Sequence, residues 1–182
     1  VAQAILGRPV AEDALILGIS GRYEFKNKGI DVFIDAMGQL NRNNGLGKEV
    51  LAFILEPAGH AGANKELLHN LELPYQAVTS TDLYLTHYLN DSANDPVMNR
   101  IRAQKLRNSE EDKVKIFFVP SYLNGDDGVF NMPYYDLLVG MDLTAFPSYY
   151  EPWGYTPLES LAFKVPTITT TLAGFGLWVK EH

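Results

Sequence analysis

Five short strand-like runs, most of them predominantly apolar, constrain the fold of this 182-residue chain more than any other feature. They occupy residues 14–19, 50–55, 114–119, 143–146 and 167–171. Such runs, without polar alternation, are typical of strands that are buried on both faces of a sheet. Segments with helical character lie between them, at residues 28–40, 59–73, 96–106, 134–141 and 156–163.

Alternating strands and helices of this kind predict an α/β fold, a doubly wound parallel sheet of the Rossmann-like type. We assign residues 1–182 to a single domain, since the length suits one core and no repeat interrupts it. Residues 75–94 mix strand formers with turn residues and carry no clear prediction, and residues 121–131 read as a polar loop. The start at Val1 and the apolar end at residues 172–179 suggest a domain cut from a longer protein at both ends.

Composition narrows the classes of function. The formal net charge is −7, which argues against a nucleic-acid surface. No apolar run reaches the ~20 residues that span a bilayer, so we expect no membrane partner. The chain has no cysteine, which excludes disulfides and thiolate metal sites and fits a reducing, cytoplasmic location. The four histidines have no metal-ligand spacing, and for His87 we expect a structural, hydrogen-bonded role.

Ligands of doubly wound sheets bind at the carboxyl ends of the strands, so we expect the loops after the first, third and fourth strands to meet in one crevice. The loop after the fourth strand carries two glutamates, Glu151 and Glu159, around a turn that leads into a helix. Gly154 permits close approach of backbone amides to a ligand, and helix N-termini favour phosphate. A sugar nucleotide, with hydroxyls at both ends and charge in the middle, suits this layout. The alternative is an acidic loop followed by a solvated helix residue.

The loop after the first strand, residues 21–29, places Arg22 and Lys28 before a helix N-terminus. The helix dipole disfavours cations at an N-terminus, and a bound diphosphate would offset this repulsion. Solvated surface cations are the alternative interpretation.

Aromatic residues gather near the same crevice, and one of them could stack on a base, although core packing explains any single ring as well. They are Tyr134, Tyr135, Tyr149, Tyr150 and Trp153. Gly174 and Gly176 follow the fifth strand and read either as a source of backbone contacts or as a plain turn.

Together, residues 21–29 (GRYEFKNKG) and 147–157 (PSYYEPWGYTP) resemble the glycogen synthases of the animal and fungal type, which are retaining glycosyltransferases of the GT-B fold. Residues 169–176 (TTTLAGFG) match as well, and the likeness covers most of the chain. Residues 65–82 are much shorter than the corresponding region of those enzymes, which contains a long helical insertion.

The resemblance implies the C-terminal, donor-binding half of a two-domain enzyme. That enzyme would transfer glucose from UDP-glucose or ADP-glucose to an α-1,4-glucan held by the N-terminal domain, without a metal or other cofactor. The catalytic residues implied are Arg22, Lys28 and Glu151. Arg22 and Lys28 would hold the diphosphate and stabilise the leaving group, with Glu151 near the donor sugar. Glu159 would bind the ribose hydroxyls, and Tyr134 or Tyr135 would stack on the base. The sugar and phosphates would be lined by Trp153, Gly154, Tyr155 and Thr156.

Other readings stay open at this point. The domain could bind a nucleotide sugar or a glucan for regulation without catalysis, or belong to a GT-B transferase with a different acceptor. A homo-oligomer of the longer protein is also open. In every case we expect the isolated piece to be inactive, because the acceptor surface would lie elsewhere.

Overall fold

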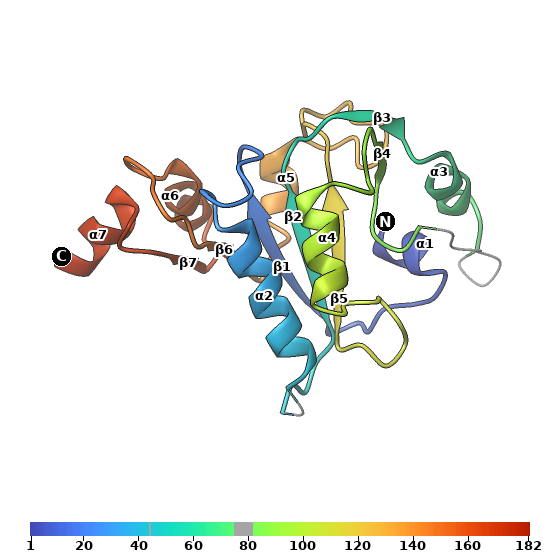
Figure 1. The fold of residues 1–182 in the computed structure, drawn as a ribbon, viewed down its shortest axis with the longest axis horizontal. Helices are drawn as coiled ribbons and strands as arrows, with labels where there is room; N and C mark the ends of the chain where they lie inside the picture. The colour runs from blue at the N-terminus through green and yellow to red at the C-terminus, as the bar shows by residue number, and fades with distance from the viewer. Residues whose placement is uncertain (44, 75–81) are drawn as a thin grey trace.

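The structure is a computed structural model that describes residues 1–43, 45–74 and 82–182. Five parallel strands form one sheet in the order β5-β2-β1-β6-β7 (Figure 1). The strands are β1 Leu15–Ser20, β2 Val50–Leu55, β5 Val114–Val119, β6 Leu143–Phe146 and β7 Thr167–Thr169. The predicted Rossmann-like α/β fold is confirmed, and all five predicted strands are present with small differences at their ends.

Helices cover both faces of the sheet. On one face α2 (Ile30–Asn41) and α4 (Pro96–Ala103) pack side by side (Figure 1). The other face is covered by α1 (Ala2–Leu6), α3 (Lys65–Leu71) and α5 (Tyr134–Leu138). At the β6–β7 end of the sheet, α6 (Tyr155–Ala162) packs against β6 and β7, and α7 (Gly174–Glu181) packs against α6 (Figure 1).

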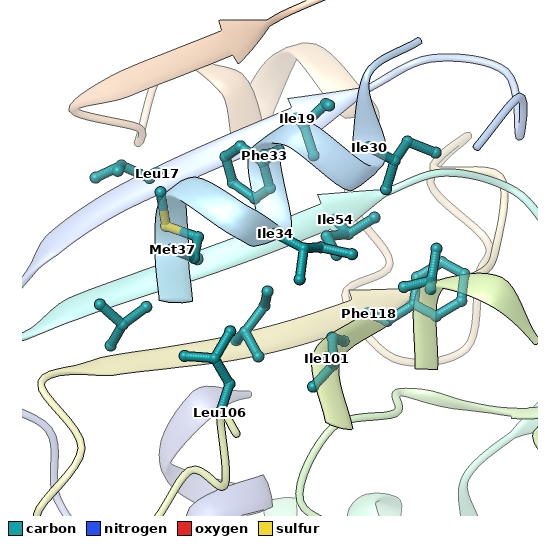
Figure 2. Close-up of a cluster of buried hydrophobic side chains, with 14 of the residues drawn as sticks. Leu17, Ile19, Ile30, Phe33, Ile34, Met37, Ile54, Ile101, Leu106 and Phe118 are labelled. Atoms are coloured by element: carbon teal, nitrogen blue, oxygen red, sulfur yellow. The ribbon is translucent and has the colours of Figure 1, made fainter. Parts of the chain in front are cut away.

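The central strands contribute alternate side chains to two separate cores, which explains their uninterrupted apolar sequences. In β2, Ile54 faces the core beneath α2 and α4, whereas Phe53 faces the core beneath α1 and α3. Figure 2 shows the first core, where Phe33 and Ile34 of α2 and Ile101 of α4 lie over the strands. Replacing an apolar residue of a central strand with a polar one would therefore disturb one of the two cores.

The predicted helix at residues 59–73 is partly wrong. Residues His60–Ala63 form β3, which pairs antiparallel with β4 (His87–Leu89), and the helix begins only at Lys65. Gly62 has a φ of 102°, which interrupts a helix, and the side chain of Asn64 caps the helix by accepting from the amides of Glu66 and Leu67. Part of the ambiguous 75–94 segment, residues 75–81, lies outside the described residues.

Two helices were missed by sequence reasoning. The five residues of α1 are too few to show a helical period. The sequence of α7 begins Gly-Phe-Gly, and glycine has low helix propensity. Gly174 and Gly176 therefore lie in the first turn of a helix, which rules out the plain turn that was one of the two open interpretations.

Candidate functional site at the carboxyl edge of the sheet

The switch in strand order beside β1 creates the candidate site. From β1, the chain moves through β2 to β5 on one side, and β6 and β7 lie on the other. In sheets of this kind the loops that follow the two neighbouring strands diverge and leave a crevice outside their carboxyl ends. A cavity of about 280 Å³ lies there, and Gly21 after β1, Ser121 after β5 and Thr156 of α6 all line it. The expectation that the loops after these three strands meet in one crevice is confirmed, and Leu55 and Pro57 at the end of β2 line it as well.

The loops after β1 and β6 are in direct contact. The amide of Tyr149 donates to the carbonyl of Asn27 at 2.9 Å. Gly29, which caps the N-terminus of α2 with a φ of 70°, lies so close to Pro147 that a Cβ on residue 29 would be 2.1 Å from its carbonyl oxygen. Only glycine tolerates both this backbone conformation and this approach. The sequence thus brings the start of α2 against the segment that leads into α6.

An ion pair joins the same two loops. The ammonium group of Lys28 contacts the carboxylate of Glu151, although 123 residues separate them in the sequence. Both side chains are largely buried, with exposed fractions of 14% and 21%. Glu151 is itself fixed because its carbonyl accepts from the amide of Gly174 at 3.1 Å. The structure therefore brings together two of the three residues that were predicted to be catalytic.

Arg22, the third of these residues, extends into solvent. Its side chain is 77% exposed and forms an ion pair with Glu24 at 3.1 Å on the same loop. Glu24 also accepts from the side-chain amide of Asn27 at 2.8 Å. Arg22 lies on the loop that borders the cavity but is not among the residues that line it. Its long side chain must turn towards the crevice if it is to reach a ligand there.

Glu159 of α6 and Tyr134 of α5 line another side of the cavity, and Tyr135 contacts Glu159. The hydroxyl of Tyr135 donates to Glu159 at 3.1 Å, and this hydrogen bond raises the pKa of the tyrosine. The ring of Tyr135 stacks on Phe163, with centroids 5.0 Å apart. Tyr134 and Glu159 both line the cavity, and the hydroxyl of Tyr134 shares a hydrogen bond of 2.7 Å with Ser20. Burial raises the pKa of Tyr134.

The turn before α6 presents backbone amides. Gly154 caps the helix with a φ of 97°, and no described side chain forms a hydrogen bond to that cap. Thr156 in the first turn lines the cavity. Tyr155 is 69% exposed, and Trp153 packs edge-to-face on Phe175 of α7 at 5.9 Å. Neither of these two aromatic residues lines the cavity in this structure.

Sequence reasoning missed one acidic residue at this edge, Glu56, which follows β2 directly. Its side chain is fully buried, and neither carboxyl oxygen has a hydrogen-bond partner within the described residues. Burial raises the pKa of Glu56 to about 8, with nearby Lys28 acting in the opposite direction. An acidic residue placed immediately after a continuous apolar strand was the available signal.

The histidines behave as expected for structural groups. His87 is buried between the hydroxyl of Thr86 and the carbonyl of Asp127, with both ring nitrogens 2.8 Å from those oxygens. His60 packs against its ring, with centroids 4.7 Å apart. Across the described parts of the chain, no three His, Asp or Glu side chains are grouped as metal ligands would be. The described helices are all too short or too polar to cross a membrane.

The sheet order and the crevice at its carboxyl edge define an α/β domain of the Rossmann-like class. The glycogen synthase family model matches residues 10–81 and 77–182. Glycogen [starch] synthase isoform 2 of Saccharomyces cerevisiae is 33% identical over 93% of this chain and 33% of the yeast protein. The liver glycogen [starch] synthase of Rattus norvegicus is 31% identical over 94% of this chain and 31% of its own length. The chain therefore belongs to the glycogen synthase family.

The chain spans about a third of the length of these relatives. The alignment to the yeast protein is 230 positions long, whereas the chain has 182 residues, so the relative has extra residues within the matched region. The boundary between the two matched segments falls at residues 77–81. Both observations agree with the expected shortening of residues 65–82.

Proposed function

We propose that this chain is the donor-binding, C-terminal half of a GT-B glycosyltransferase that extends an α-1,4-glucan with glucose from UDP-glucose or ADP-glucose, with retention. The contact between Lys28 and Glu151 carries the proposal. It brings a buried cation to the amide-rich start of α6, at the switch point of the sheet. Membership of the glycogen synthase family supports the same reaction.

The diphosphate of the donor would rest between Lys28 and the first turn of α6. In this structure Glu151 pairs with Lys28 and neutralises its charge. The phosphates would take over this cation, and Glu151, released from the pair, would face the donor sugar. Amides of Gly154, Tyr155 and Thr156 would donate to phosphate oxygens, because the start of a helix carries unpaired amides and positive potential.

Catalysis would be electrostatic in this arrangement. As the bond between glucose and the diphosphate breaks, negative charge builds on the leaving phosphate. Lys28 and, after its side chain turns inward, Arg22 would stabilise that charge, which is often the largest contribution to catalysis. No metal or other cofactor has a step in this proposal.

The nucleoside would occupy the cavity beside α5. Glu159 lines it and is held by Tyr135, so its carboxylate is oriented to accept hydrogen bonds from ribose hydroxyls. Tyr134 lines the same cavity, whereas the ring of Tyr135 already stacks on Phe163. These contacts favour Tyr134 over Tyr135 as the ring that a base would meet first. Trp153 would reach the sugar only if its ring left Phe175.

The α-glucan acceptor would bind mainly to an N-terminal domain that this sequence does not contain. We place the protein in the cytoplasm, which the cysteine-free sequence supports. Nucleic acid and membrane have no part in the proposal.

Calorimetric titration with UDP, ADP and their glucose conjugates tests the donor site. We expect Lys28→Met to weaken UDP binding by about 10- to 100-fold, the cost of losing one charge-assisted contact to phosphate. Lys26→Met is the matched control, because Lys26 lies on the same loop but is 75% exposed and paired with Asp31. Equal affinity of both variants and the unaltered protein would contradict the proposed site. Binding without any transfer by the full-length protein would favour a regulatory module instead.

A further inference from the structure

Glu56 is an acid without a partner beneath the proposed diphosphate site. It follows the last residue of β2 and is fully buried, with both carboxyl oxygens unpaired among residues 1–43, 45–74 and 82–182. The residues on either side of it, Leu55 and Pro57, line the cavity. The backbone of Glu56 therefore joins two residues of the cavity wall, and its carboxyl lies against Gly21, which also lines the cavity.

The carboxyl group is close to the cation that would bind phosphate. The position that a Cβ on Gly21 would take is 3.4 Å from an oxygen of Glu56 and 3.8 Å from the Cδ of Lys28. Both side chains thus pack against the same glycine of the loop after β1. Lys28 is already paired with Glu151 on its other side, so it does not neutralise Glu56 by a direct contact.

The titratable groups facing Glu56 come from two elements. Lys28, Glu24 and Tyr23 belong to the loop after β1, and Tyr134 belongs to α5. Ionising a buried carboxyl without a partner is costly, and the nearby Glu24 adds to that cost. The pKa of Glu56 is accordingly raised to about 8, so that the carboxyl is mostly neutral at pH 7.

We propose that Glu56 is a positioning residue that sets the charge of the diphosphate site: as a neutral acid it leaves the attraction of Lys28 for an anionic donor intact, and as a carboxylate it opposes that attraction. The inference rests on the proposed function. The two ion pairs of the neighbouring loops, Lys28–Glu151 and Arg22–Glu24, are each neutral. Among these residues around Lys28, the state of Glu56 therefore decides whether the net charge is zero or one negative charge.

Donor binding and protonation of Glu56 then favour each other. A bound diphosphate makes the carboxylate form of Glu56 still less favourable, so binding near pH 8 draws a proton onto this residue. The reciprocal effect is a loss of affinity as the pH rises. With one proton involved, affinity falls by up to about tenfold between pH 7 and pH 9.

Calorimetry with UDP tests this coupling. Titrations at pH 8 in two buffers of different ionisation enthalpy count the protons taken up, and titrations from pH 7 to pH 9.5 give the pH dependence of the dissociation constant. The terminal phosphate of UDP is almost fully ionised over this range, since phosphate monoesters have a second pKa of about 6. We expect the unaltered protein to take up a substantial fraction of a proton at pH 8 and to lose affinity with rising pH.

Two variants separate the role of Glu56 from a merely structural one. We expect Glu56→Gln, which has the same size and stays neutral, to bind UDP without proton uptake and with affinity constant within about twofold across this range. Glu24→Gln, the matched control, removes a neighbouring but partly exposed carboxylate and should retain the proton uptake. The proton count of the unaltered protein needs no variant, so it is decisive even if Glu56→Gln folds poorly.

The outcomes are distinguishable. Binding of UDP by the unaltered protein without proton uptake at pH 8 would overturn the role of Glu56 alone, and so would uptake that persists in Glu56→Gln. A failure to bind UDP at every pH would overturn the proposed donor site, and the inference about Glu56 with it.

Discussion

Lys28 lies between two acids that differ in their surroundings. Glu151 contacts it directly and is 21% exposed, whereas Glu56 is fully buried and unpaired within the described residues. A single cation thus has an ionised partner on one side and a neutral acid on the other. This asymmetry is a property of individual residues, and two predictions follow at this scale.

The first prediction concerns turnover. In the full-length protein, Arg22→Ala and Lys28→Ala should each lower kcat by about 10²- to 10³-fold, since each removes a charge that would stabilise the leaving diphosphate. Near-UV circular dichroism should show that both variants keep the native fold. Steady-state assays with UDP-glucose and glycogen give kcat, with Lys26→Ala as the control that retains it. Near-normal turnover in both variants would exclude the catalytic role.

The second prediction concerns stability and pH. The pKa of Glu56 is raised from 4.5 to about 8 in the folded chain. Between pH 4.5 and about pH 8, Glu56 releases its proton in the unfolded chain but keeps it in the folded chain. The contribution of Glu56 to the free energy of unfolding is therefore most favourable below pH 4.5 and is lost progressively as the pH rises to about 8. Glu56→Gln should abolish this loss and gain stability relative to the unaltered protein, by at most about 5 kcal/mol at pH 8.5.

Thermal or urea unfolding of both proteins at pH 5.5 and pH 8.5 checks this second prediction. The difference in unfolding free energy between them should grow in favour of Glu56→Gln from the lower pH to the higher. A difference that stays constant across the two pH values would mean that Glu56 titrates normally in the folded chain.

At the scale of elements, the site depends on the approach of α2 to the segment before α6. Gly29 is the closest point, where the cap of α2 meets the carbonyl of Pro147. The hydrogen bond between Tyr149 and Asn27 holds the same two segments together. The ion pair between Lys28 and Glu151 can form only because this approach is so close.

We expect Gly29→Ala to lower the unfolding free energy by about 2–4 kcal/mol, through the strain of a positive φ and the clash with Pro147. UDP binding should weaken as well, because the two loops are forced apart. Gly47→Ala is the matched control, since a Cβ there meets nothing within 4 Å. Urea unfolding and UDP titration measure both effects, and equal behaviour of the two variants would contradict the proposed packing.

At the scale of the molecule, helices cover both faces of the sheet (Figure 1). The crevice lies at the carboxyl edge of that sheet. Everything that we assign to the donor lies at that edge, and nothing that we assign to the acceptor lies in this chain. The chain also spans about a third of the length of its curated relatives. Binding and transfer should therefore be separable.

We expect the 182-residue chain to bind UDP but not to transfer glucose to glycogen, and the full-length protein to do both. Incorporation of labelled glucose from UDP-glucose and from ADP-glucose measures transfer and identifies the preferred base. Incorporation by the isolated chain would show that an acceptor site lies within these residues after all.

The sequence by itself determined the class of fold and most of the candidate site. The continuous apolar runs specified strands buried on both faces, because a parallel sheet covered by helices leaves no solvated face. The two loop motifs then pointed to Lys28, Glu151 and Glu159. The start of α3 was misplaced because two tertiary and local features outweighed an apparent helical period. They are the cap at Asn64 and the antiparallel pairing of β3 with β4, in which His60 is opposite Leu89 and Ala63 is opposite His87.

Only the tertiary structure decided which of the candidate residues meet. Sequence spacing places Lys28 and Glu151 far apart, and their contact depends on the strand order, which puts β6 beside β1. The exposed position of Arg22 and the buried, unpaired position of Glu56 are likewise invisible in the sequence. The physical reason is that the solvation and charge of a side chain depend on neighbours brought in by distant segments.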